Sequence, residues 1–529
     1  MEVGKALMVA VLAVTLAISS RAAEGSFVDD DHDGIDDALE QLLAEKFAPV
    51  VYIEPGESNY PANVGWILQR ASLWYYEDCW PDINELVLTT VSSQERLIGP
   101  PWVHPDSWGS GHPERHCGDP PHHRRISTIA EDPDGEGSTG YSDQSTFVLP
   151  DVAEAHRVGS LDPREWVTYF HAYPTSEGGV MIQYWHTFAY NDFTVGDHGG
   201  DWDATIHVQL DNNLSLKGAW FSRHRDDHPG TFKSATELTL YQGTHILMAI
   251  DGGGHAAFAS PQDWCDYNTG GSHMGTIVWG DNPDNPSQLH RVPGGLGFCD
   301  PYDSSDVAGG TVWKTWTSGD VRQAGSVEHT INPNPSRHGG LINMGEYNPC
   351  TSSACQGTRQ ASTLLAGEFH PLNGQVFIRY SGRWGSIGII SSGPRGPVFQ
   401  GFDGSTYTAW YNQASNVPLN PRLVLNEADG AILWYLEGEI YDRRLGPLCS
   451  TKFPYLVSGT VTVPASEILT VCPGVTVRFI SGGRIKANGI LNADGRTGTI
   501  EFISNEDITK GMKISSQFVL ENGGEFRIP

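Results

Sequence analysis

The chain has 529 residues, including 61 glycines, 33 prolines and 16 tryptophans, and its formal net charge at pH 7 is −30. This charge argues against a nucleic acid partner and against direct adsorption to an anionic membrane, because both would repel an acidic protein. The length exceeds that of one ordinary core, so we expect at least two domains. Frequent turn residues, many aromatic residues and few segments with helical periodicity predict a mainly β fold.

Residues 1–22 have the features of a secretory signal peptide. Lys5 precedes an apolar run at residues 6–18, and a cleavage site between small residues follows at Ala22. No later stretch approaches the roughly 18 apolar residues that a membrane-spanning helix needs. We therefore expect a secreted or cell-surface protein without a transmembrane segment.

The chain contains eight cysteines. An even number in an exported protein favours disulfide bonds over zinc sites. Many connectivities are possible, so the pairs are predicted from proximity in the sequence alone. They are Cys79 with Cys117, Cys265 with Cys299, Cys350 with Cys355, and Cys449 with Cys472.

Residues 23–47 begin with an acidic run in the spacing of a calcium-binding loop. Gly34 stands at the sixth position, where such loops turn sharply, and a short amphipathic helix is predicted at residues 38–47. The pattern resembles the short acidic calcium repeats of thrombospondin type three. The alternative is a solvated acidic linker with aspartates at the N-terminus of the helix. The candidate calcium ligands are Asp29, Asp31, Asp33, Asp37 and Glu40.

Residues 48–445 contain short β runs separated by turns, with the spacing of a β-sandwich that carries functional loops at one end. The most unusual segment is the octapeptide Gly-Asp-His-Gly-Gly-Asp-Trp-Asp at residues 196–203, which leads into an alternating, strand-like run. We expect this run to have one apolar face and to place the carboxylates on the other face. The expected apolar face consists of Trp202, Ala204, Ile206, Val208 and Leu210.

The clustering of carboxylates and an imidazole in the octapeptide predicts a metal site. Two carboxylates that are two residues apart on a strand can lean toward one cation, and a histidine can approach from the glycine turn at residues 199–200. Oxygen-rich ligand sets favour Ca²⁺ or Mg²⁺ over zinc. The candidate ligands are Asp192, His198, Asp201 and Asp203.

The residue pattern of the sequence changes after about residue 446. Short β runs with glycine turns recur from residue 460 to residue 520, which suggests a small β-solenoid-like module. A small β-sandwich is the alternative, because the repeats do not share a residue pattern. We therefore expect a signal peptide at 1–22, an acidic segment with a short helix at 23–47, a β-sandwich domain at 48–445, and the C-terminal module at 446–529.

Five motifs, taken in order, resemble the vacuolar protein sorting sixty-two family over roughly residues 45–400. The first is the strand-like opening at residues 48–66, and the second is the octapeptide. The later motifs are short segments that contain His224, His255 and Trp384. The name of this family records a sorting phenotype, so the resemblance implies no particular chemistry for an exported protein.

The octapeptide is also similar to the heptapeptide of necrosis-inducing-like proteins, which are secreted β-sandwich cytolysins that bind a divalent cation and membrane sphingolipid sugars. This resemblance implies metal-binding roles for His198, Asp201 and Asp203, with Asp192 as the upstream acidic ligand. Gly200 replaces the second histidine of that family, and Asp203 is shorter than its final glutamate. The resemblance therefore implies cation binding more than it implies toxin activity.

Three functions fit these observations. The first, which we expect, is a non-enzymatic, metal-dependent binding protein for glycans or glycolipid headgroups, because tryptophan and tyrosine rings stack well on sugars. The second is a metal-assisted extracellular hydrolase with His224 or His255 as the general base. No nucleophile elbow, zinc-protease helix or phosphate loop supports that alternative. The third is a structural surface protein, in which the octapeptide only bonds turn backbone.

Overall fold

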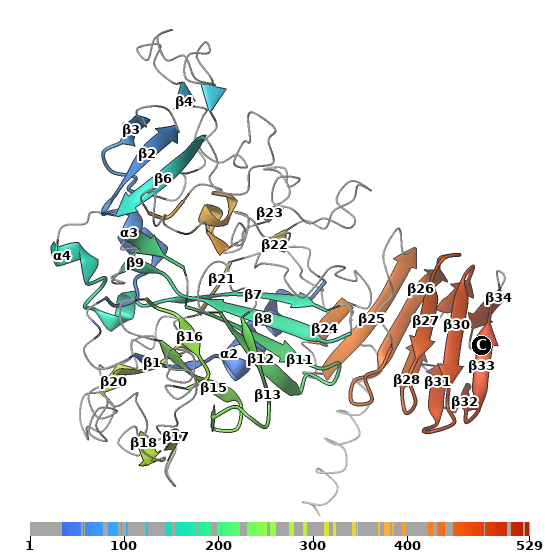
Figure 1. Cartoon of the computed structure of the whole chain (residues 1–529). Helices are drawn as coiled ribbons and strands as arrows, with labels where there is room; N and C mark the ends of the chain where they lie inside the picture. The colour runs from blue at the N-terminus through green and yellow to red at the C-terminus, as the bar shows by residue number, and fades with distance from the viewer. Residues whose placement is uncertain are drawn as a thin grey trace, which may run out of the picture.

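The structure is a computed structural model (Figure 1). It describes residues 34–53, 57, 59–77, 83–93, 97, 102–103, 123–124, 144–150, 154–175, 178–191, 198–202, 204–222, 230–250, 254–260, 275–279, 289–293, 311–316, 321–323, 341–344, 346–347, 369–370, 375–380, 383–385, 394, 396–397, 422–426, 431–439, 448–480, 482–504, 509–521 and 524–527. Among the described residues strand predominates over helix, 51% against 11%, which confirms the mainly β fold.

The middle of the protein is a six-stranded sheet in the order β13-β12-β11-β8-β7-β21. Strands β7, β8, β11, β12 and β13 pair antiparallel with their neighbours, while β21 adds to β7 in parallel. The strands are β7 (Thr168–Pro174), β8 (Val180–Trp185), β11 (Thr205–Leu210), β12 (Leu216–Ser222), β13 (Thr231–Ser234) and β21 (Leu341–Asn343).

A second sheet has the order β14-β15-β1-β19-β20, with β16 paired to β15. Its strands are β1 (Val50–Ile53), β14 (Leu240–Tyr241), β15 (His245–Ile250), β16 (Ala257–Phe258), β19 (Thr311–Lys314) and β20 (Val321–Gln323). One hydrophobic cluster contains side chains of both sheets, including Val51 and Met248 from this sheet and Ile182 and Ile206 from the first. The two sheets therefore share one core.

Helix α2 (Asp37–Phe47) confirms the helix predicted at residues 38–47, and it packs its apolar side into the same core. Asp36 caps its N-terminus by accepting a hydrogen bond from the backbone nitrogen of Ala38, at 3.1 Å. Gly34 has a left-handed backbone with φ +97°, which glycine adopts without strain. Glu40 is fully buried and accepts a hydrogen bond from Asn343 at 2.7 Å.

The other elements before the C-terminal module are short. A three-stranded sheet has the order β3-β2-β6, and the pairs β4-β5, β9-β10, β17-β18 and β22-β23 are two-stranded. The strands are β2 (Ala71–Glu77), β3 (Ile83–Leu88), β4 (Trp102–Val103), β5 (His123–Arg124), β6 (Gln144–Pro150), β9 (Phe188–Asn191), β10 (His198–Asp201), β17 (Gly275–Trp279), β18 (Leu289–Pro293), β22 (Glu346–Tyr347) and β23 (Phe369–His370). The helical turns are α3 (Val64–Leu68), α4 (Glu154–Arg157), η3 (Pro163–Glu165) and η7 (Val376–Arg379).

The C-terminal module is built largely from parallel strand pairs, drawn in orange and red in Figure 1. β26 pairs in parallel with β28 and β29, β28 with β31, and β27 with β30. The strands are β24 (Arg422–Asn426), β25 (Ala431–Glu439), β26 (Tyr455–Val463), β27 (Ile468–Val471), β28 (Thr476–Phe479), β29 (Arg484–Ala487), β30 (Ile490–Asp494), β31 (Ile500–Ser504), β32 (Gly511–Ile514), β33 (Gln517–Leu520) and β34 (Gly524–Arg527). Repeated parallel pairing is what a solenoid needs, and the solenoid itself stays a prediction.

The sheet of this module crosses the domain boundary predicted at residue 446. β24 and β25 belong to it, because β25 pairs in parallel with β26 and buries Trp434 and Leu436. The predicted Cys449–Cys472 disulfide is confirmed. The other six cysteines lie outside the described residues. The module meets the central sheet at the turn after β11, where Asn213 accepts hydrogen bonds from the backbone nitrogens of Thr451 and Lys452.

Candidate functional site

Residues 198–201 of the octapeptide form β10, which pairs with β9. β9 and β10 are antiparallel, with Asp201 opposite Phe188 and His198 opposite Asn191. All residues of both strands are buried. The chain leaves β10 after Asp201 and begins β11 at Thr205, so it does not continue as one strand.

Because of this break, the prediction of one apolar face is correct for the residues along β11 and wrong for Trp202. Ala204, Ile206, Val208 and Leu210 all lie in the core between the two sheets. Trp202 instead packs in a different cluster, where its ring lies 5.6 Å from that of Trp384. The alternation of side chains along a strand does not extend back across the break.

Asp201 is the centre of the site. The side chain is fully buried, and its Oδ2 accepts hydrogen bonds from Nδ1 of His255 at 2.8 Å and from Nδ2 of Asn191 at 3.0 Å. Burial by itself would raise the pKa of Asp201. The hydrogen bond from His255, the charges of His255 and His198, and the Asn191 amide outweigh burial, so the pKa lies below its usual value. Asp201 is therefore a buried carboxylate that stays ionised.

His198 is oriented as metal-binding histidines commonly are. Its Nδ1 donates a hydrogen bond to the carbonyl oxygen of Gly200 at 2.8 Å, so in the neutral form of the ring Nε2 carries the lone pair. A hydrogen bond from the second ring nitrogen to a backbone carbonyl is the usual support for a ligating imidazole. The metal-binding role of His198 stays a prediction.

His255 is fully buried and has an uncommon backbone conformation. Its φ is +54°, in the left-handed region that few residues other than glycine adopt. The ring stacks on Phe188 with centroids 3.8 Å apart and planes 5° apart, while Nδ1 is held by Asp201. Backbone strain of this kind costs about 1–3 kcal/mol and often marks functional sites.

Glu57 completes the site, and our sequence prediction missed it. Its Oε2 lies 3.9 Å from Nε2 of His255, on the side of the ring away from Asp201. Its Oε1 accepts a hydrogen bond from the backbone nitrogen of Asn59 at 2.6 Å. The available signal was an acidic residue in a proline-glycine turn just after β1, but nothing in the sequence links that turn to residues 201 and 255.

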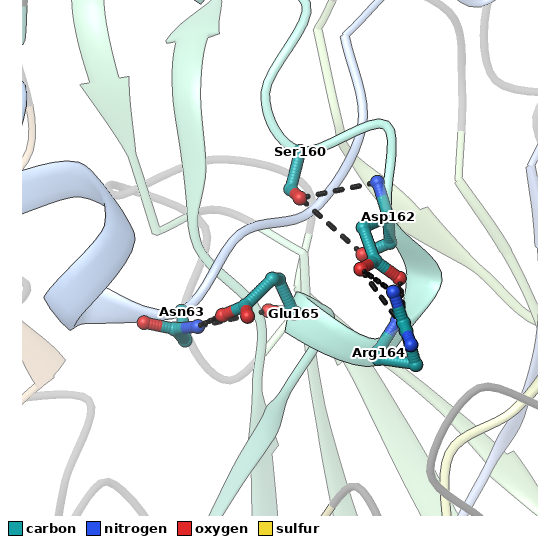
Figure 2. A network of polar contacts seen from close by, with 5 residues as sticks. All are labelled: Asn63, Ser160, Asp162, Arg164 and Glu165. Atoms are coloured by element: carbon teal, nitrogen blue, oxygen red, sulfur yellow. Dashed lines mark hydrogen bonds and ion pairs between the residues drawn. The ribbon is translucent and has the colours of Figure 1, made fainter. Parts of the chain in front are cut away.

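The segment after Glu57 is fixed against β9 by a clamp of backbone and side-chain bonds. Pro61 forms a β-bridge with Phe188, and the backbone nitrogen of Ala62 donates to the carbonyl of Thr187. Figure 2 shows the outer part of this clamp, where the Asn63 side chain reaches Glu165, beside the contacts among Ser160, Asp162 and Arg164. These bonds hold the segment that follows β1 beside Phe188, whose ring stacks on His255.

Gly200 has a structural reason for being glycine. Its φ is +74°, and a Cβ atom at this position would lie 2.0 Å from the carbonyl oxygen of Trp384. Any side chain at this position would meet the backbone around Trp384.

The other predicted site residues lie apart from this network or outside the described residues. Asp192, Asp203, His224, and the calcium-loop residues Asp29, Asp31 and Asp33 lie outside the described residues. Asp37 and Glu40 are on α2, and one Glu40 oxygen is bonded to Asn343. Within the ranges that the structure describes, no three His, Cys, Asp or Glu side chains gather as ligands of one ion.

A neighbouring buried histidine should make the stability of the fold depend on pH. Nδ1 of His186 donates to the carbonyl of Ala204 at 2.7 Å, and Nε2 accepts from Thr168 at 3.0 Å. Burial lowers the pKa of His186 from 6.5 to about 4, although the bond to Ala204 opposes this change. Between these two values the unfolded chain takes up a proton that the folded chain does not, so stability falls as the pH falls. The full loss is about 3 kcal/mol.

Urea unfolding from about pH 7 down to about pH 4 should measure this loss. His186→Gln, which cannot take up that proton, is expected to show a shallower decrease over the same range. Parallel curves for the two proteins would contradict the assignment.

Comparison of the chain with family models, curated proteins and solved structures found no match. The two family resemblances therefore stay predictions. In the part of the chain that the structure describes, no helix has the length and apolar character needed to cross a bilayer.

Proposed function

We propose that the protein is an extracytoplasmic, metal-dependent binding module that recognises glycans or glycolipid headgroups without catalysing a reaction. The observation that carries the proposal is Asp201, a buried carboxylate that stays ionised beside two imidazoles. Burying an ionised group is costly, so a buried carboxylate that stays ionised is expected where it helps to bind a cation or a specific ligand. The resemblance to cytolysins that bind a cation and lipid sugars agrees with this choice.

The non-enzymatic part of the proposal is supported by His255, the candidate general base that the structure describes. A general base must come within hydrogen-bond reach of the substrate. The His255 side chain has no exposed surface, and its two ring nitrogens face Asp201 and Glu57. It is therefore placed as part of an internal network and not as a group that meets substrate.

An extracytoplasmic location agrees with the Cys449–Cys472 disulfide, because structural disulfides persist mainly in oxidising compartments. In such compartments millimolar Ca²⁺ and Mg²⁺ can fill weak, oxygen-rich sites. A net charge of −30 predicts an acidic protein surface, which would repel acidic headgroups. A bound divalent cation would attract both the protein and the headgroup, and so could bridge them.

The proposal is tested by calorimetric titration of the protein with Ca²⁺ and with Mg²⁺. The wild-type protein should bind one of these ions, and Asp201→Asn should bind it at least about tenfold more weakly. Asn191→Ala, which removes the amide bond to Asp201 but keeps the carboxylate, is the second variant in case Asp201→Asn does not fold. On a glycan array, binding should be lost when a chelator is added. Equal affinities in all three proteins, or glycan binding that persists in chelator, would contradict the proposal.

A further inference from the structure

A half-buried arginine just after helix α3 has no carboxylate partner. The guanidinium of Arg70 lies over the ring of Trp66, 4.1 Å from the ring centroid, and its Nη1 donates a hydrogen bond to the carbonyl oxygen of Trp66 at 3.0 Å. Across the described ranges no acidic side chain pairs with it. Acidic residues are not scarce in this chain, which has 63 of them against 33 lysines and arginines. We therefore expect the unpaired guanidinium to have another role.

The guanidinium of Arg70 is held in one orientation and still has donors to offer. Its N–H groups on Nε and Nη2 form a fork that matches two oxygens of a carboxylate or of a tetrahedral oxyanion. Neither nitrogen has a protein partner, and neither belongs to the buried polar atoms that lack one, so solvent reaches both. The ring and the carbonyl of Trp66 fix the plane of the fork, which reduces the entropy lost when an anion binds.

The surroundings add positive charge and connect Arg70 to the candidate site. His156 on α4 lies perpendicular to Trp66, with ring centroids 6.3 Å apart. The next residue, Arg157, is exposed and places its guanidinium 4.5 Å from the ring centroid of Tyr190. Tyr190 is on β9, which pairs with the octapeptide strand β10. Helices α3 and α4 and strand β9 lie together at the left of Figure 1. This basic and aromatic surface therefore borders the octapeptide hairpin.

We propose that Arg70 binds a carboxylate or sulfate group of an acidic saccharide, with Trp66 as the residue that positions it. The inference rests on the proposed function, because it names the class of glycan that the protein recognises. Charge complementarity selects this occupant. An acidic sugar forms two charge-assisted hydrogen bonds with the fork, whereas a neutral sugar forms weaker ones. The rest of the protein, with its net charge of −30, repels anions and confines their binding to this surface.

The test is calorimetric titration of the full-length protein with a sulfated oligosaccharide, a carboxylated one and their neutral parent of the same length. The wild-type protein should bind an acidic form at least about tenfold more tightly than the neutral parent. Arg70→Gln should abolish this preference, and Arg70→Lys, which keeps the charge but lacks the fork, should lose most of it. The matched control is Arg164→Gln, which removes the same charge from an exposed arginine that is paired with Asp162, and which should keep the preference.

Two further measurements separate binding from a structural role. Added salt should weaken the binding of the acidic saccharide more in the wild-type protein than in Arg70→Gln, because salt screens the charge that the variant lacks. Trp66→Leu should weaken the same binding, and Trp66→Phe, which still offers a ring face to the guanidinium, should restore most of it.

Equal wild-type affinities for the three saccharides, an unchanged preference in Arg70→Gln, or an equal loss in Arg164→Gln would overturn the inference and leave the proposed function standing. An acidic peptide that binds as tightly as the acidic saccharide would overturn the assignment to sugars. Binding that needs Arg70 but persists in chelator would support the inference and contradict the metal dependence of the proposed function. A protein that binds none of the saccharides would overturn both.

Discussion

Replacing Gly200 with alanine is expected to lower the free energy of unfolding by about 2–5 kcal/mol. Two effects add. The left-handed backbone at φ +74° strains any residue with a side chain, and the new Cβ atom would lie 2.0 Å from the carbonyl oxygen of Trp384. A backbone carbonyl cannot rotate away as a flexible side chain could, so either β10 or the segment around Trp384 must shift. Urea unfolding of the variant measures the loss.

Gly243→Ala separates the two effects. Gly243 has nearly the same backbone conformation, with φ +78°, but no atom lies within 4 Å of where its Cβ would be. Only the conformational strain of about 1–2 kcal/mol should therefore appear. If both alanine variants lose the same amount, the contact with Trp384 contributes nothing, and the structural reason given for Gly200 is wrong.

The second large effect is expected where Asp201 meets His255. Removing one member of a buried, hydrogen-bonded charged pair typically costs about 3–5 kcal/mol, because the other member is left in the interior. We expect a loss of this size for Asp201→Asn and for His255→Gln. The double variant should lose clearly less than the sum of the two, because the two side chains share one interaction. Unfolding measurements on the four proteins give the coupling energy.

The direction of the pH dependence at this pair follows from the carboxylate. The pKa of Asp201 is lower in the folded protein than its usual value of 3.8, so its contribution is complete above that value and disappears as the pH falls below it. Acid should therefore reduce the difference in stability between the wild-type protein and Asp201→Asn. Additive losses in the double variant, or a difference that grows in acid, would show that Asp201 and His255 do not act as a pair.

The sequence predicted those parts of the structure that depend on local pattern. The helix at residues 38–47, the apolar face of β11 and the short strands of the C-terminal module all follow from side-chain periodicity, and the structure has them. The Cys449–Cys472 pair was predictable because the two residues are only 23 positions apart. Each of these features is decided within one short segment of chain.

The site was only half predictable, for the same reason. Asp201 and His198 stand in one conspicuous octapeptide, whereas His255 contacts Asp201, and Glu57 contacts His255, from distant parts of the chain. The position of Glu57 depends on the bridge between Pro61 and Phe188, which joins residues far apart in the chain. The error for Trp202 has a similar origin, because the partner of its ring is Trp384, which lies far away in the sequence.

The position of β1 has a consequence for how the molecule folds. This strand leaves the ribosome early, yet its partners are β15 and β19, so Val50 lies opposite Leu247 on one side and Lys314 on the other. At ordinary rates of synthesis, about 5–20 residues per second, the first partner follows roughly 10–40 s later. Until then a fully apolar strand has no sheet to join, and pairs so distant in sequence form slowly. The central place of β1 makes the sheet beside the candidate site a late product of folding, and the hairpin of β9 and β10 can form before it.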